Sequence, residues 1–302
     1  MNSLNKITHR AVLGVRVALV VAVVVLAPVA HGQKSFPTPE AAADALVDGM
    51  SRHDWDAVAV VAGADYKKHI PIGAIAEGDL TNFLEAWAKS HKIVSAGPDK
   101  AFLGAGLYGW TLPIPIVKTA TGWHFELKGA ADEMRTRRIG RNELAAIQTI
   151  LAYTDAQEEY FRKDRNRNGV KQFAQKALST SGKQDGLYWA SLPGEAESPL
   201  GPAFADAKAD QPYHGYAYRI LTAQGKDAPG GAKSYIKNGR MVDGYALVAW
   251  PAKYDDTGVM TFIVSRDGVV YQKNLGADTA TAVRAITAYN PDLSWSKVKP
   301  AK

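Results

Sequence analysis

The sequence predicts a fold of the α+β class, in which a small domain of helices and a curved sheet precedes a second α+β domain with one long helix and an antiparallel sheet. Helix signals fill the first third of the chain and give way to one hairpin, over residues 110–127. A long amphipathic pattern then covers 142–163, and four strand patterns follow after residue 212. Blocks of helix and blocks of strand, rather than strict alternation of the two, are typical of α+β proteins.

Residues 1–32 predict a cleavable secretory signal. They include no acidic residue and three basic ones, Lys6, Arg10 and Arg16. The apolar run 17–30 has 14 residues, whereas a membrane-spanning helix needs about 20. Ala30-His31-Gly32 places small residues where a signal peptidase cuts, which makes Gln33 the new terminus. The alternative is an uncleaved anchor, which Pro28 disfavours. We therefore expect a periplasmic or secreted protein with no membrane span after processing.

The amino-acid composition excludes several kinds of cross-link, metal site and partner. There is no cysteine, so disulfides, thiolate zinc sites and a lipid anchor on a cysteine are excluded. The 36 basic and 30 acidic residues give a net charge of +6, but three of the basic residues lie in the leader. The remaining charges are interspersed, apart from two short basic clusters that flank a predicted helix and suit solvated faces. We expect no nucleic-acid partner and no cofactor.

The first domain is predicted over residues 33–130 and begins with helices. Thr38 suits the cap of a first helix and Pro39 its first position. The apolar spacing predicts two further helices, from Trp55 to Ala62 and from about Leu80 to His91. The first domain therefore opens with three helices.

A hairpin follows these helices. The segment 110–118 is extended, and its two prolines, Pro113 and Pro115, indicate an edge or bulged strand. Trp123, Phe125 and Leu127 alternate on the returning strand, and Gly104-Ala105-Gly106 predicts a turn. In its order of elements this domain is similar to the cone-shaped folds of the nuclear-transport-factor-2-like group, in which a curved sheet wraps helices.

A polar, basic stretch at 129–140 marks the boundary with the second domain, predicted over 131–302. Its long helix is expected from about Asn142 to Lys163, with a shorter helix at 170–178. The remainder is assigned to a surface loop over 182–211, to strands over 213–221, 245–250, 259–264 and 269–273, and to a closing helix over 280–289.

Several phrases of the sequence carry a family resemblance. They are Gln33 to Glu40 (QKSFPTPE), Ile139 to Glu143 (IGRNE), Asp185 to Trp189 (DGLYW), Gly215 to Gly225 (GYAYRILTAQG) and Gly244 to Asp267 (GYALVAWPAKYDDTGVMTFIVSRD). Over nearly its whole mature length the chain resembles the bacterial exported domain-of-unknown-function family 2950. The resemblance implies an address in the cell envelope and brings no known activity.

The second half is also loosely similar to the soluble headpiece of type IV pilins and pseudopilins. One helix, a variable loop and then strands over 244–270 follow the order of elements in that headpiece. A pilin, however, carries its hydrophobic segment directly before the helix, whereas here that segment lies more than 100 residues upstream. The resemblance therefore implies a pilin-headpiece-like fold without assembly into a pilus.

One segment matches half of a calcium-binding loop. Asp164, Asn166 and Asn168 place oxygen side chains at alternate positions, and Gly169 follows them for the turn. Calcium favours several carboxylates, but only Asp164 is charged, and Gln175 stands where a bidentate glutamate belongs. The competing interpretation, a helix-ending turn held by asparagine and glycine, is the better supported of the two.

The sequence offers no clear catalytic residues. His69, His91 and His124 are candidates for an acid–base pair, yet none has the spacing of a metal-binding helix. His124 alternates with the aromatic residues beside it and should face away from them. Trp110, beside the proline-broken strand, could line an aromatic pocket.

These observations favour a non-catalytic binding or scaffolding component of the cell envelope, whose partner is an envelope protein or a glycan. A sheet edge in the second domain could recruit a partner strand. The alternative is an envelope enzyme with a pocket in the N-terminal domain, built from histidines that are distant in sequence.

Overall fold

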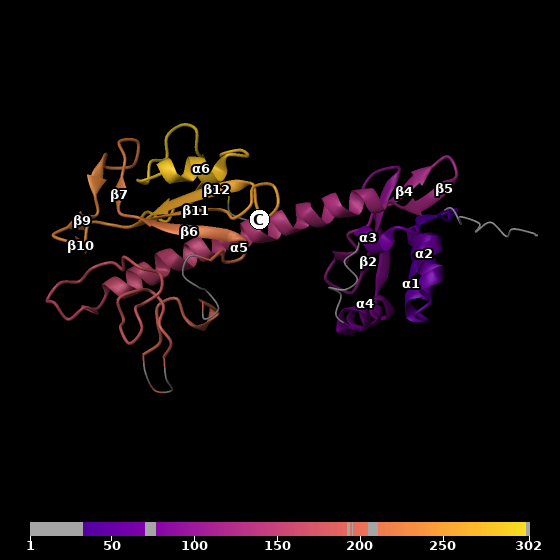
Figure 1. Cartoon of the computed structure of the whole chain (residues 1–302), viewed down its shortest axis with the longest axis horizontal. Helices are drawn as coiled ribbons and strands as arrows, with labels where there is room; N and C mark the ends of the chain where they lie inside the picture. Colours follow the sequence, from indigo (N-terminus) through magenta and orange to yellow (C-terminus); the bar gives the residue numbers. More distant parts are fainter. Residues whose placement is uncertain (1–32, 70–76, 192–193, 195, 205–210, 300–302) are drawn as a thin grey trace, which may run out of the picture.

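The computed structural model describes residues 33–69, 77–191, 194, 196–204 and 211–299. The predicted signal peptide, residues 1–32, lies outside these ranges. Two lobes sit at opposite ends of one long helix, α5 (Leu127–Phe161), as Figure 1 shows. The N-terminal lobe holds everything before α5 and the C-terminal lobe everything after it, so the predicted α+β class is confirmed.

Three helices of the N-terminal lobe lie largely where the sequence predicts, and a short fourth one was not expected. They are α1 (Pro39–Ser51), α2 (Trp55–Ala62), α3 (Tyr66–His69) and α4 (Glu77–Lys89). The Thr38 side chain accepts the Ala41 N–H at 3.2 Å and caps α1. Gly63 follows α2 at φ +104, a conformation that favours glycine.

The sheet of the N-terminal lobe is larger than the predicted hairpin. Its strands are β1 (His91–Ser95), β2 (Lys100–Ala105), β3 (Trp110–Thr111), β4 (Ile116–Thr119) and β5 (Gly122–Phe125). The order is β1-β2-β4-β5, with β3 also paired to β2. The expected turn at Gly104–Gly106 is wrong in part, because Gly104 and Ala105 end β2 and only Gly106, at φ +75, turns the chain. Leu103, Ile116 and Phe125 pack against α1 and α2 in the core.

Helix α5 begins fifteen residues before the expected Asn142 and runs without a break through the basic stretch at 129–140. Glu126 caps it, accepting the Lys128 and Gly129 amides at 2.9 and 2.6 Å. Its first turns pack on the N-terminal lobe through Ala130. Ala146, Ile150, Tyr153, Ala156 and Tyr160 lie at helical spacing and are buried against the C-terminal lobe.

The segment after α5 is irregular, and the helix predicted at 170–178 is wrong. There the backbone bonds to other elements: Phe173 N–H donates to Met241 O at 2.8 Å. The buried amide of Gln157 accepts the Ala174 N–H and donates to the Ala174 carbonyl, both at 2.8 Å. These tertiary bonds replace the helical ones. The predicted surface loop at 182–211 contains one 3₁₀ turn, η2 (Pro202–Phe204), among its described residues.

A five-stranded antiparallel sheet organises the C-terminal lobe, in the order β14-β13-β12-β11-β6. Its strands are β6 (Tyr216–Leu221), β11 (Ala246–Pro251), β12 (Met260–Ser265), β13 (Tyr271–Asn274) and β14 (Ser296–Lys297). Four two-residue strands form side ribbons: β7 (Ala223–Gln224), β8 (Lys233–Ser234), β9 (Ile236–Lys237) and β10 (Arg240–Met241).

The sheet is covered on both faces. Tyr153 on α5 donates to Ala246 O, and Tyr245 donates back to Thr154 O, so α5 packs on one face. The other face carries α6 (Thr279–Ala282) and η3 (Val283–Ala285). The predicted closing helix at 280–289 is therefore too long, because the chain leaves it at Ile286 and Tyr289 bridges to Gln224. Within the described ranges no helix is long and apolar enough to cross a membrane.

Candidate binding cleft under the C-terminal strap

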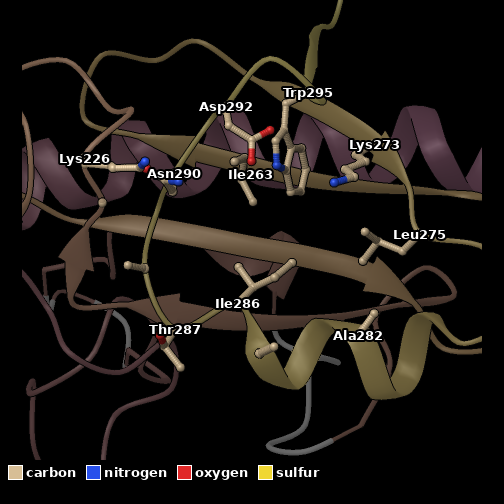
Figure 2. A pocket seen from close by; sticks show the side chains of 13 residues that line it. Lys226, Ile263, Lys273, Leu275, Ala282, Ile286, Thr287, Asn290, Asp292 and Trp295 are labelled. Atoms are coloured by element: carbon tan, nitrogen blue, oxygen red, sulfur yellow. The ribbon is translucent and has the colours of Figure 1, made fainter.

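The strap is the chain from Ile286 to Val298, which crosses the face of the sheet opposite α5. It is fixed at both ends: Tyr289 N–H donates to Ala223 O at 2.9 Å, and Val298 N–H donates to Val270 O at 2.9 Å. Near its end the strap forms β14, which pairs with β13, and between Tyr289 and Ser296 it passes over the sheet (Figure 2). The space beneath it is a cleft of about 520 Å³, within the size range of small-molecule sites.

The floor of the cleft is apolar and its rim is polar. Ile263 on β12, Leu275 after β13 and Ile286 form the floor, as Figure 2 shows. The rim carries polar or aromatic side chains from three separate segments: Lys226, Lys273, Asn290, Asp292 and Trp295. An apolar base with a few convergent polar groups is the usual composition of a ligand site.

The rim charges are arranged around Asp292. Its Oδ1 accepts the Ser294 N–H at 2.8 Å and also the Ser294 hydroxyl. These hydrogen bonds, helped by the charges of Lys273 and Lys226, hold the pKa of the Asp292 carboxyl below its usual value. Asp292 is therefore ionised at neutral pH, and two ammonium groups outweigh it on the rim.

The two lysines differ in how they are held. Lys273 Nζ donates to Ser294 Oγ at 2.7 Å and lies 5.8 Å from the centre of the Trp295 ring. These two contacts of Lys273 fix the position of the strap and the orientation of the Trp295 indole. Lys226 is exposed and makes no hydrogen bond or ion pair with any described residue. It is the cation on the rim that can turn to a ligand without breaking a contact.

Asn290 fixes the geometry of the cleft at the end next to Asp227. Its Oδ1 accepts the Asp227 N–H at 2.9 Å, and its Nδ2 donates to an Asp227 carboxylate oxygen at 2.9 Å. A Cβ on Gly225 would overlap the Asn290 side chain, so this close approach requires glycine. Arg219 stabilises the side of the cleft formed by η3 and the start of the strap, because it donates to the carbonyls of Val283 and Ile286 at 2.6 and 2.8 Å.

The lining suits binding better than acid–base chemistry. No histidine lines the cleft, and the hydrogen bonds from Ser294 to Asp292 Oδ1 lower the pKa of that carboxyl, which makes it a weak base. A general base works best when its pKa lies near the working pH. The chemistry present is an indole face, two ammonium groups, one carboxylate and an amide.

The predicted calcium residues lie outside the cleft lining, shortly after the end of α5. Asp164 accepts the amides of Asn168 and Gly169 at 3.3 and 2.7 Å. Asn168 Oδ1 accepts the Val170 N–H at 3.2 Å, and Asn166 Oδ1 accepts the Tyr160 hydroxyl at 3.5 Å. All three side-chain oxygens thus serve the turn itself. Across the described ranges, no three histidine, aspartate or glutamate side chains gather where they could hold a metal. Calcium binding stays a prediction.

The candidate histidines of the N-terminal lobe do not come together. His69 ends α3, His124 is in β5, and His91 begins β1, where its Nδ1 lies 3.0 Å from Trp87 O. The His91 ring stacks on Trp87 with centroids 4.0 Å apart. No aspartate or glutamate among the described residues is buried, so none of the three has a buried acid beside it. Trp110 is 48% exposed.

Sequence reasoning did not find the cleft. Lys226 follows β7, Lys273 lies in β13 and Asp292 lies in the strap, so the three share no spacing that a motif could report. Trp295 is partly buried and packs against the core of the C-terminal lobe, and a tryptophan in the sequence gives no sign of which role it has. Only the fold of the strap over the sheet reveals the site.

Fold and site together define a two-lobed α+β protein with a ligand-sized cleft in its second lobe. The chain matches the family described as a protein of unknown function, DUF2950, over residues 33–298, and it belongs to that family. No curated protein and no solved structure matches it. The resemblances to pilin headpieces and to cone-shaped folds therefore stay predictions.

Proposed function

We propose that this chain is exported and acts in the cell envelope as a non-catalytic binding protein, holding a saccharide unit of an envelope glycan in the cleft under the strap. The observation that carries the proposal is the combination of the Trp295 indole with polar groups of both charges on an apolar floor. A sugar presents apolar C–H faces that suit an aromatic ring and hydroxyls that suit Asp292, Asn290 and lysine side chains.

Two further observations support export. The family match begins at residue 33, the expected first residue after cleavage. The Gln33 side chain is already docked there, its Nε2 donating to Val61 O at 3.1 Å and to Phe125 O at 2.6 Å. Cleavage before Gln33 would preserve both of these hydrogen bonds. N-terminal sequencing of protein recovered from the periplasm or medium tests this, and a chain that still begins at Met1 would contradict it.

The ligand is tested by calorimetry on the mature chain with a neutral probe, chitotriose, and an acidic probe, trigalacturonate. Lys226 makes no hydrogen bond or ion pair with a described residue, whereas the carboxylates of Asp292 and Asp227 already accept hydrogen bonds. We therefore expect the acidic probe to bind more tightly. Lys226→Ala should weaken that binding about tenfold, which corresponds to about 1.4 kcal/mol. Trp295→Phe should weaken both probes.

Lys171→Ala is the matched control, since Lys171 is an exposed lysine near the end of α5, outside the cleft lining. It should leave both affinities unchanged. Binding that survives both Lys226→Ala and Trp295→Phe would place the saccharide elsewhere, and no heat with either probe would remove the proposal.

A further inference from the structure

Strand β1 in the N-terminal lobe has one unpaired edge. It pairs only with β2, and the bonds Ala96 N–H to Lys100 O at 2.8 Å and Gly106 N–H to Ser90 O at 2.8 Å fix the alternation of that ladder. Residues 92 and 94 therefore bond to β2, while the backbone groups of His91, Ile93 and Ser95 point outward. The described parts of the chain offer these outward groups no hydrogen-bond partner.

The open edge is positively charged. Lys89 precedes β1 and Lys92 lies within it, both are exposed, and neither forms an ion pair with a described residue. Residues 86–98 contain no aspartate or glutamate. An edge lysine deters pairing with a like-charged strand and becomes complementary when the incoming strand is acidic.

An aromatic surface adjoins the same edge. Ala105 pairs with His91 on one side and with Trp110 on the other, which places both rings around the end of β2. Trp87 stacks on His91, and Phe83 meets Trp110 edge-on at 5.8 Å. Tyr108, in the turn between β2 and β3, is 99% exposed. Trp110 and Tyr108 lie on the β3 side of β2, away from the open edge, so the stacked rings of Trp87 and His91 are the part of this surface that can hold an apolar side chain at one end of an added strand.

We propose that β1 is a docking edge for an extended, acidic segment of a partner protein, which adds to this sheet as a sixth strand. The main-chain groups of His91, Ile93 and Ser95 supply the hydrogen bonds. Lys89 and Lys92 select the acidic segment, and the aromatic surface takes an apolar residue of that segment. A second copy of this chain is disfavoured, because two β1 edges meeting antiparallel would bring their lysines together. The proposal is independent of the cleft.

The test uses the mature chain and capped peptides of about six residues, the length of a typical strand. One peptide alternates valine with glutamate and the other valine with lysine. Hydrogen exchange is followed at single amides by NMR. With the glutamate peptide, we expect the outward amides of Ile93 and Ser95 to slow markedly. The amides of Lys92 and Val94 are bonded to β2 already and should change little.

Two variants keep the test decisive. Ile93→Pro removes one outward N–H, and proline is tolerated on an edge strand, so peptide affinity should fall at least about tenfold while the Val94 amide stays protected. Should that variant fail to fold, Lys89→Glu with Lys92→Glu should transfer the preference to the lysine peptide. Unchanged exchange at Ile93 and Ser95, equal protection by both peptides, or protection that grows with protein concentration alone would overturn the proposal.

Discussion

Contacts of individual side chains stabilise the irregular segment between α5 and β6, where the backbone forms few regular hydrogen bonds. Arg165 is one of these residues, and its side chain is only 5% exposed although it carries a charge. Its guanidinium lies 5.6 Å from the Tyr160 ring centre and 5.1 Å from that of Trp189. The cation joins the end of α5 to the following loop by its planar faces, which a lysine could not reproduce.

Asp185 closes the next turn and gives this segment an acid-sensitive contact. It accepts hydrogen bonds from Lys176 Nζ at 2.7 Å and from the Thr180 amide at 2.7 Å. The bond from Lys176, followed by those from Thr180, lowers the pKa of Asp185 from 3.8 to about 2. A lowered folded-state pKa stabilises the fold above the unfolded value, and the contribution disappears as the pH falls from 3.8 to about 2.

We therefore expect Asp185→Asn to unfold at lower urea concentration than the parent at neutral pH, with a difference that shrinks between pH 4 and 2. Urea denaturation followed by circular dichroism at several pH values measures this difference. Asp278→Asn is the control, because the Asp278 side chain makes no capping hydrogen bond. A parent–variant difference that stays constant down to pH 2 would contradict the assignment.

At the scale of elements, α5 continues through a glycine that its packing does not require. A Cβ on Gly140 would meet no atom within 4 Å. Glycine in a helix interior costs about 0.5–1 kcal/mol relative to alanine. Gly140→Ala should raise the free energy of unfolding by about that amount, measured by urea denaturation.

Gly258→Ala provides the opposite case. Gly258 lies where Tyr216, a fully buried side chain, packs on the chain, and a Cβ there would overlap the Tyr216 hydroxyl. Alanine should therefore destabilise the fold through overpacking, by about 1–3 kcal/mol. If Gly140→Ala also lowers stability, then α5 needs flexibility at that point and the continuous helix is the wrong description of it.

Elements with local signals were predictable from the sequence. The Thr38–Pro39 cap gives α1, and the largely apolar runs at 246–251 and 260–265 give the central strands. The predicted long helix begins only at Asn142, because the sequence pattern does not show the partners of the polar side chains at 129–140. In the structure Asp132 pairs with Arg135, and Glu133 with Arg137, at helical spacing.

Other elements depend on distant contacts that no local pattern reports. Val170, Phe173 and Ala174 have helical spacing, yet Met241 and Gln157 take their backbone bonds. Strand β1 follows α4 after a single residue, so its start was absorbed into the predicted helix. The cleft depends on where the strap crosses the sheet, which is a property of the whole C-terminal lobe.

At the scale of the molecule, both lobes use α5, and their contacts overlap along it. The N-terminal lobe reaches to Arg137, whose guanidinium donates to the carbonyl and hydroxyl of Thr111. The C-terminal lobe begins to contact the helix at Arg135, which pairs with Asp255 at 3.2 Å. Asn142 then donates to Thr257 O, and Glu143 accepts the Val259 and Met260 amides.

This overlap predicts where the chain can be divided. A cut after residue 130 removes Met134 and Arg137 from the N-terminal lobe, whereas a cut after 141 keeps them. The contacts to the other lobe that it breaks are the exposed ones of Arg135 with Asp255 and of Arg138 with Asp256. We expect fragment 33–141 to exceed fragment 33–130 in unfolding free energy by about 2 kcal/mol, from two hydrogen bonds and the packing of Met134. Fragment 33–148 is the control, since its added residues contact the C-terminal lobe alone and should bring no further gain. Equal stability of 33–130 and 33–141 in urea denaturation would show that the first turns of α5 belong to the C-terminal lobe alone.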